Sequence, residues 1–350
     1  MNSHNPQPET CTKIERQSWQ LDYVKRRLSR FRILIWMVAI LFETTFLESG
    51  QAAETVDKFF RIGFTSGMFT DVNENDARAA VKVLSQTLAR ERGIPTNPEP
   101  LIFKDRTTLL DALRGQNTDV VGLMMTEYAA LTNSVRFAPI FVTYIGGRTT
   151  VEYVLLVHQS SQIESVADLQ GRSLVFYQNP RACLAPLWLD TLLAEKGFPK
   201  SARHVGKITQ QSKLSNVVLP VFFRKVDACV VTRTSFNTMV ELNSQVGKQL
   251  RIIASSTNFV PSIFAFREDY NPSFKEKLLA SLRDLHKRPT GQQVLTIFQS
   301  EKMEDHPASC LDSALELIAT HARLCSGTNT SETSSMEINR SIQKIYEREN

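Results

Sequence analysis

The chain has 350 residues, of which 42% are hydrophobic, and a formal net charge of +5 at neutral pH. This length suffices for one large core or two ordinary ones, so we expect a globular protein with two lobes. The first 52 residues hold 7 of the 41 basic and 5 of the 36 acidic residues, which leaves about +3 for the rest. That balance is too small to indicate a nucleic-acid partner.

The first 52 residues have the pattern of a secretory signal. Residues 1–32 are polar and basic, and the run 33–42 (ILIWMVAILF) is uniformly apolar. This run is shorter than the roughly 20 residues that cross a bilayer. Gly50 and Ala52 follow it at a spacing that signal peptidase accepts. We therefore predict a signal peptide over residues 1–52, with a retained signal anchor as the alternative.

From Phe59 onward, short β-rich runs alternate with helical stretches, the pattern of an α/β fold with mainly parallel sheets. The predicted strands are 59–65, 99–104, 119–125, 135–144, 150–159, 173–178, 227–232, 250–256 and 260–269. The main predicted helices are 74–92, 107–116, 127–133, 184–196, 210–225, 233–243, 271–289, 290–299 and 308–324. We expect the first helix to be capped near Asn75 or Asp76 and to end at Gly93. No strand is predicted after residue 269.

This order of elements predicts two lobes joined by two crossings of the chain. We assign residues 57–145 and 259–325 to lobe 1, because the strand at 260–269 can return to the first unit. Residues 146–258 form lobe 2. Residues 326–350 are polar and are predicted to form a mobile C-terminal tail.

Several catalytic and metal-binding classes are excluded by missing motifs. The sequence contains no GxSxG elbow, no GxxxxGK[ST] loop and no HExxH pair. The four cysteines after the leader stand in no metal-binding spacing, so we predict neither a metal nor a cofactor. Cys310 and Cys325 bracket a predicted helix about 22 Å long, which favours free thiols over a disulfide between them. Cys183, near a helix start and Arg181, leaves a cysteine-dependent enzyme as a minor alternative.

Polar residues stand where five predicted strands end or where the chain crosses between lobes, and open α/β sheets place their ligands at those ends. Each residue alone is equally consistent with a helix cap or a turn. Their convergence from five loops makes the set a candidate binding site. The candidates are Thr65, Ser66, Thr126, Tyr128, Tyr144, Gln178, Arg181, Thr232 and Arg233.

Five segments carry a resemblance to a known family: IGFTSGMF (62–69), DVVGLMMTEYAAL (119–131), YVLLVHQSSQIESVADLQGRSLVF (153–176), QNPRACLAPLWLDTLLAEKGF (178–198) and LPVFFRKVDACVVT (219–232). In this order the chain resembles the type II periplasmic substrate-binding proteins, and within them the phosphate, phosphite and phosphonate branch of ABC importers. The resemblance spans about residues 58–300. It implies a monomeric periplasmic receptor without catalytic activity that closes on a small anion and docks on a membrane permease.

The residues at the implied ligand site depart from the family pattern. Where the family has D-P-x-S-x-S-G, with a helix N-terminus holding the anion, this chain has Asn179, Pro180, Arg181, Ala182 and Cys183. The resemblance also places Lys213 near a family histidine, Thr232 where an acidic residue often binds an amino group, and Tyr128 at a ligand tyrosine.

Arg181 offers two parallel donors and Lys213 a point charge, so we expect an anionic ligand and doubt an aminoalkylphosphonate. Two alternatives remain open. Arg181 points to solvent beside a degenerate site, or the protein is a receptor that senses a ligand for a membrane signalling partner.

Overall fold

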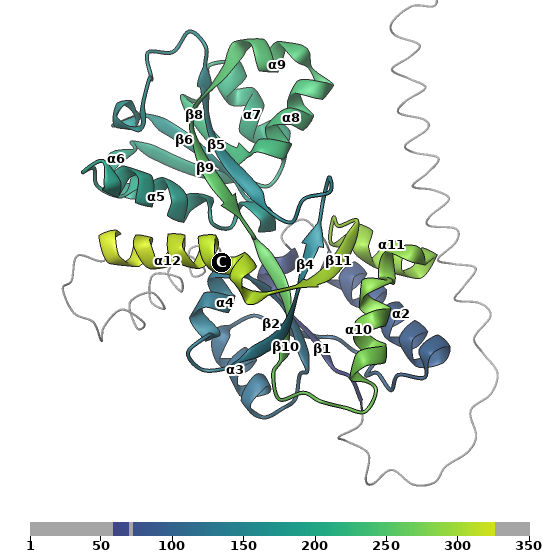
Figure 1. Cartoon of the computed structure of the whole chain (residues 1–350). Coiled ribbons are helices and arrows are strands. Elements are labelled where there is room, and N and C mark those ends of the chain that lie inside the picture. Colours follow the sequence, from purple (N-terminus) through teal and green to yellow (C-terminus); the bar gives the residue numbers. More distant parts are fainter. Residues whose placement is uncertain (1–58, 70–72, 326–350) are drawn as a thin grey trace, which may run out of the picture. The chain divides into compact units, whose positions relative to one another are not determined.

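The structure, a computed structural model, describes residues 59–69 and 73–325 (Figure 1). The predicted signal peptide and the predicted C-terminal tail lie outside the described residues. Among the helices that the structure describes, none combines the length and the apolar character needed to cross a membrane.

The first sheet has six strands in the order β11-β4-β10-β3-β1-β2. They are β1 (Ile62–Thr65), β2 (Leu101–Phe103), β3 (Val120–Met124), β4 (Phe137–Tyr144), β10 (Ser262–Arg267) and β11 (Lys302–His306). β1 pairs in parallel with β2 and β3. The pairs β10–β3, β10–β4 and β11–β4 are antiparallel.

The second sheet has five strands in the order β7-β6-β8-β5-β9. They are β5 (Val151–His158), β6 (Ser173–Tyr177), β7 (Lys207–Gln211), β8 (Ala228–Thr232) and β9 (Leu250–Phe259). β6 pairs in parallel with β7 and β8. β5 is antiparallel to both β8 and β9.

The predicted α/β class is confirmed, but both sheets are mixed rather than mainly parallel. Within the described residues, four of the nine strand pairings are parallel and five are antiparallel. The reason lies in the two crossings of the chain between the sheets. β4 leads into β5 through a turn at Gly146 and Gly147, both with positive φ, and β9 leads into β10 through Val260 and Pro261 (Figure 1). β5 and β10, the strands that follow the two crossings, run against the direction of the parallel strands in their sheets.

Helices cover the faces of the sheets (Figure 1). The α-helices are α2 (Glu74–Arg92), α3 (Arg106–Arg114), α4 (Met125–Leu131), α5 (Ala185–Glu195), α6 (Ser201–His204), α7 (Leu214–Phe222), α8 (Arg233–Leu242), α9 (Ser244–Gln249), α10 (Lys275–Arg283), α11 (Pro289–Ile297) and α12 (Asp312–Cys325). Short 3₁₀ helices are η1 (Ser66–Phe69), η2 (Val166–Leu169), η3 (Pro180–Ala182), η4 (Leu285–Lys287) and η5 (Ala308–Leu311).

The ends of α2 show how local sequence sets a helix boundary. Its N-cap is Asn73, whose side-chain oxygen accepts a hydrogen bond from the backbone N–H of Asn75 at 2.8 Å. The predicted cap at Asn75 or Asp76 is therefore wrong, because Asn73 is the residue with the extended backbone that a cap requires. Gly93 ends the helix with a φ of 55°, as expected, since glycine adopts this left-handed conformation without steric cost.

The C-terminal helix α12 packs against helices that flank both sheets. It follows β11 of the first sheet, yet it packs on α5 beside the second sheet and on α4 beside the first (Figure 1). Ala314, Leu317, Ile318 and Ala322 are buried on one face, at the spacing of an amphipathic helix. Ala314, Leu317 and Ile318 belong to one apolar cluster that also includes residues of β3, β5 and α5. The packing of α12 therefore links the cores of the two lobes.

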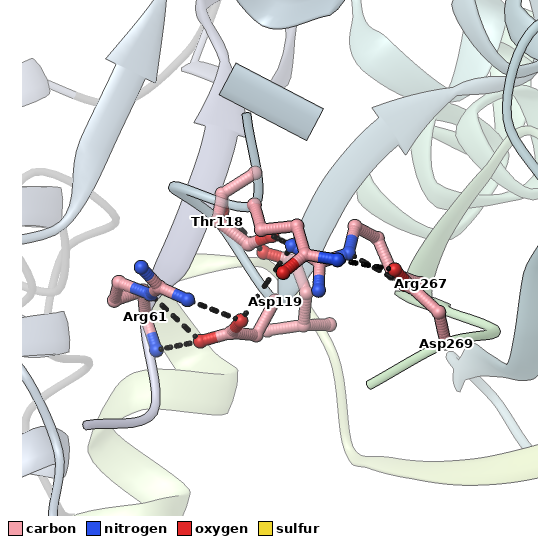
Figure 2. A network of polar contacts seen from close by, with 7 residues as sticks. Arg61, Thr118, Asp119, Arg267 and Asp269 are labelled. Atoms are coloured by element: carbon pink, nitrogen blue, oxygen red, sulfur yellow. Dashed lines mark hydrogen bonds and ion pairs between the residues drawn. The ribbon is translucent and has the colours of Figure 1, made fainter. Parts of the chain in front are cut away.

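A buried network of charges lies at the end of the first sheet away from the crossings (Figure 2). The Asp119 side chain is 0% exposed and accepts from Arg61 Nε at 3.0 Å and Nη2 at 2.9 Å. Arg267 Nη1 lies 3.9 Å from the same carboxylate and donates to the Thr118 carbonyl at 3.0 Å. Arg267 Nε donates to Asp269 at 2.8 Å. These contacts tie together the starts of β1 and β3 and the end of β10.

Candidate ligand-binding cleft

A cavity of about 40 Å³ lies where the crossings and the first turns of both lobes meet. That space corresponds to a few water molecules. Residues from both sheets line it: Met68, Thr143, Asn179, Pro180, Arg181, Ser262, Phe264, Ile297, Phe298, Gln299 and Ser300. Contacts between η1 of lobe 1 and η3 of lobe 2 bring the two lobes together at this place.

Arg181 is held in place by hydrogen bonds of its backbone. Its N–H donates to Asn179 Oδ1 at 2.9 Å, and its carbonyl accepts from the Tyr153 hydroxyl at 3.0 Å. Tyr153 is fully buried, and its oxygen also accepts from the Leu184 N–H at 3.3 Å. Asn179 caps η3, and the Tyr153 hydroxyl binds the Arg181 carbonyl. These contacts fix the backbone from which the Arg181 side chain extends.

The Arg181 guanidinium is a partly buried cation at the cavity. It makes no hydrogen bond or ion pair with any residue in the described ranges 59–69 and 73–325. Burial lowers its pKa to about 10, while Glu301 and Tyr153 act in the opposite direction. The Glu301 carboxylate itself accepts from the N–H groups of Gly146 at 2.8 Å and Gly147 at 3.2 Å. Arg181 therefore remains charged at neutral pH and is partly dehydrated.

Two hydroxyl groups line the same cavity. Thr143 of β4 and Ser262 of β10 make no side-chain hydrogen bond within the part of the chain that the structure describes. The other lining is largely apolar, with Met68, Phe264 and Phe298 among it. This arrangement combines donors for an anion with a surface that suits a short hydrocarbon group.

Only two of the predicted site residues, Asn179 and Arg181, line this cavity. The segment Ser66–Phe69 forms η1 and contributes Met68 rather than Ser66 to the lining. Gln178 precedes Asn179 and donates its backbone N–H to the Gln211 carbonyl at 3.0 Å.

Tyr128, Thr126 and Tyr144 stand outside the lining. Tyr128 is buried in the core, its ring 5.7 Å from that of Phe137, and burial raises its pKa. Thr126, in the first turn of α4, is also buried. The Tyr144 hydroxyl lies 3.0 Å from His306 Nε2.

The predicted residues of the later lobe 2 loops also have other contacts. Thr232 caps α8 by accepting from the Ser235 N–H. Arg233 forms a bidentate ion pair with Glu152, whose pKa is lowered mainly by that hydrogen bonding. Lys213 is exposed ahead of α7. None of the three lines the cavity.

Glu127, in the first turn of α4, is a charged residue that sequence reasoning missed. Its carboxylate accepts from Thr65 Oγ1 at 2.6 Å and from the Met124 N–H at 2.8 Å. Thr65, a predicted ligand residue, is thus committed to a contact with the first turn of α4. The signal for Glu127 was present in the sequence, because an acidic residue at the third position of a helix returns to the N-terminal backbone.

Cys183 is a hydrogen-bond donor to the second crossing. Its thiol lies 3.3 Å from the Pro261 carbonyl, which also accepts from the Met125 N–H at 2.9 Å. Burial, with a smaller effect from Glu127, raises the pKa of this thiol to about 12. This environment disfavours the thiolate that a cysteine-dependent enzyme needs, although Cys183 lies near a helix start and Arg181. All four cysteines of the described residues are free thiols.

We expect Cys183 to react with a thiol-directed alkylating reagent at pH 8 at least about 100-fold more slowly than a free cysteine, whose pKa is near 8.5. Mass spectrometry of the alkylated peptides measures this rate, and alkylation in urea provides the fully reactive control. Selective and rapid labelling of Cys183 in the folded chain would instead support the cysteine-dependent enzyme.

Comparison with known proteins agrees with this geometry. The sequence profile of the family described as "ABC transporter, phosphonate, periplasmic substrate-binding protein" matches residues 66–307. A comparison with curated proteins gives no match.

Among similar solved structures is XAC2383 from Xanthomonas citri bound to chloride ion, with 18% identity and a TM-score of 0.58 over 76% of this chain and 98% of that chain. PA3383 of Pseudomonas aeruginosa, a binding protein component of an ABC phosphonate transporter, has 13% identity and a TM-score of 0.52 over 83% and 99%. PhnD1 from Prochlorococcus marinus, in complex with methylphosphonate, has 13% identity and a TM-score of 0.51 over 74% and 97%.

At these identities the solved structures show a shared fold, and they confirm the predicted type II periplasmic binding protein architecture. The family profile covers most of the chain, from η1 to the residue after β11. The chain therefore belongs to the family of periplasmic phosphonate-binding proteins of ABC transporters.

Proposed function

We propose that the chain captures a small anion between its two lobes and delivers it to the permease of an ABC importer. The observation that carries this proposal is the Arg181 guanidinium, which is partly buried at the cavity without a counter-ion among the described residues. Removing a cation from water without a partner costs free energy, and a bound carboxylate or phosphoryl group offsets that cost.

Two similar structures support an anion of this kind. The Prochlorococcus protein is described in complex with methylphosphonate, and the Xanthomonas protein bound to chloride. Both ligands are anions, and methylphosphonate also carries a small apolar group. In this chain Arg181, Thr143 and Ser262 supply donors, and Met68, Phe264 and Phe298 supply apolar contacts. A short alkylphosphonate matches that combination better than inorganic phosphate, which is polar on every side.

Transport requires that the closed form differ from the open one. A ligand that contacts both η3 of lobe 2 and β4 or β10 of lobe 1 binds the closed state more tightly than the open state, and so increases the closed population. The permease then recognises a surface formed only on closure. We further propose that the chain acts in the periplasm as a monomer, as is expected for such a receptor.

We expect a thermal-shift panel of phosphate, phosphite, methylphosphonate, longer alkylphosphonates and dicarboxylates to contain at least one stabilising anion. At a ligand concentration of 100 times the dissociation constant, the gain is about 2.7 kcal/mol. For a protein of this size that corresponds to a rise in Tm of roughly 5–10 °C. Sodium chloride at equal ionic strength is the control. A panel without one stabilising member would argue against anion capture.

A further inference from the structure

A second and larger cavity lies at the strand ends of the second sheet that are away from the cleft. It has a volume of about 270 Å³, compared with about 40 Å³ for the cleft. Its lining comes from the end of β5 and the loop after it, from the residues ahead of β6, and from the loop between α7 and β8: His158, Ser160, Ser161, Gln162, Ile163, Arg172, Arg224, Val226 and Asp227. Arg172 precedes β6, whereas the cleft residue Arg181 follows its other end. The two cavities are therefore separate.

Cationic groups outnumber anionic groups around this second cavity. Arg172 and Arg224 line it together with one carboxylate, Asp227. Asp227 Oδ2 already accepts from the Ser173 N–H at 2.8 Å and hydroxyl at 2.6 Å, while Oδ1 lies 4.0 Å from Arg172 Nη1. The Arg224 side chain has no hydrogen bond or ion pair with any of residues 59–69 and 73–325.

Neutral donors complete the lining. The Ser161 hydroxyl is buried and has no hydrogen-bond partner within the described residues. His158 Nδ1 accepts from the Ser160 N–H at 3.1 Å, which leaves Nε2 as the protonated nitrogen of a neutral ring. The loop itself is fixed, because Arg251 Nη2 donates to the carbonyls of Ser161 and Ile163. The same Arg251 nitrogen also donates to the Glu164 carboxylate at 3.1 Å.

Arg224 occupies a backbone position that normally holds glycine or asparagine. Its φ is 57°, and it directly follows the last turn of α7, where the chain leaves the helix in the left-handed conformation. Side chains other than glycine are strained there, and such strain concentrates at functional sites. An arginine at this position is unfavourable for the fold alone, and it places a guanidinium without a partner at the cavity.

We propose that this cavity is a second anion site, separate from the cleft, that binds a phosphate-bearing ligand through Arg224 and Arg172. Two guanidinium groups suit the bidentate binding of phosphoryl oxygens. The Ser161 hydroxyl and His158 Nε2 provide further donors. The source of the phosphate is either a free solute, such as a diphosphate, or the headgroup of an anionic lipid.

The test uses Arg224→Gly, because glycine relieves the backbone strain while it removes the charge. Inorganic pyrophosphate is titrated by calorimetry into Arg181→Ala protein, whose cleft is disabled, and into the Arg181→Ala/Arg224→Gly double variant. We expect binding to the first and at least tenfold weaker binding to the second. The Tm of Arg224→Gly should equal or exceed that of the wild type, which separates loss of a site from loss of folding. Arg90→Ala, which removes an exposed arginine from α2, is the charge-matched control.

Vesicle co-sedimentation identifies the source of the ligand. Wild-type protein and Arg224→Gly are compared on vesicles of phosphatidylglycerol and of neutral phosphatidylcholine. Arg224-dependent binding to the anionic vesicles identifies the ligand as a lipid headgroup. Binding of pyrophosphate without Arg224-dependent binding to vesicles identifies the ligand as a free solute. If Arg224→Gly changes neither pyrophosphate binding nor vesicle binding, the second site does not exist. This outcome is independent of the cleft, so failure here leaves the proposed function untouched.

Discussion

Asp119→Asn is expected to lower the free energy of unfolding by about 3–5 kcal/mol, the cost of removing one partner from a buried ion pair. The asparagine side chain keeps the size of the residue but loses the charge that faces Arg61 and Arg267. Arg267 retains Asp269, whereas Arg61 loses its ion pair and one of two side-chain hydrogen bonds, because the asparagine amide keeps only one acceptor oxygen. In a domain of this size the Tm falls by roughly 6–20 °C.

Asp305→Asn provides a matched control for this experiment. Asp305 also forms a two-contact ion pair, with Arg283 Nε at 2.6 Å and Nη2 at 2.9 Å, but both side chains are more than a third exposed. Solvent screening limits such a pair to about 0–1 kcal/mol. Equal loss of stability in the two variants, measured by urea denaturation, would show that burial is not what makes the Asp119 network important.

Arg181→Ala is expected to weaken anion binding by about 30- to 5,000-fold, the range that corresponds to a loss of 2–5 kcal/mol when one member of a desolvated charge pair is truncated. Folding should be little affected, because the Arg181 contacts that hold η3 are made by backbone atoms. Lys213→Ala removes the same charge from an exposed position outside the cavity and should change affinity less than about twofold. Calorimetry with the best anion of the panel measures both.

The pH dependence of binding gives an independent check of the same residue. Because burial holds the pKa of Arg181 at about 10, the cation is present below that pH and is lost above it. Affinity for an anion of constant charge should be flat between pH 8 and 9 and should fall as pH rises through about 10. An affinity that is unchanged from pH 9 to 11 would contradict the lowered pKa of Arg181.

The sequence predicted all interior strands of both sheets but only two of the four edge strands, β2 and β9. β7 and β11 are missing from the prediction, and each lies at an edge of its sheet. Their residues, KITQQ and KMEDH, are largely polar and only partly buried. Edge strands carry charged and polar residues that discourage pairing with other chains, so the apolar pattern that reveals interior strands is absent from them.

The candidate site was predictable only where a single segment builds it. Asn179 and Arg181 follow a strand and begin a helical segment, so their place at the sheet edge can be read from their own neighbours. Thr143 and Ser262 line the same cavity from strands on either side of the two crossings. The alternation of side chains along β4 does not tell whether Thr143 or Tyr144 faces the cleft. Whether Ser262 reaches the cleft depends on the path of the chain through the second crossing.

The attachment of α12 constrains the kinetics of ligand exchange. Separating α12 from α5 would expose Leu317 and Ile318, at roughly 1.5–3 kcal/mol for each side chain. Moving α12 together with α5 costs less free energy than separating the two helices. Residues 307–311, between β11 and α12, then act as a third hinge beside the two crossings. Three hinges restrict lobe 2 to rotation about an axis that is compatible with all three. We therefore expect changes to the chain at 307–311 to alter the rate of ligand release without altering the residues of the cleft.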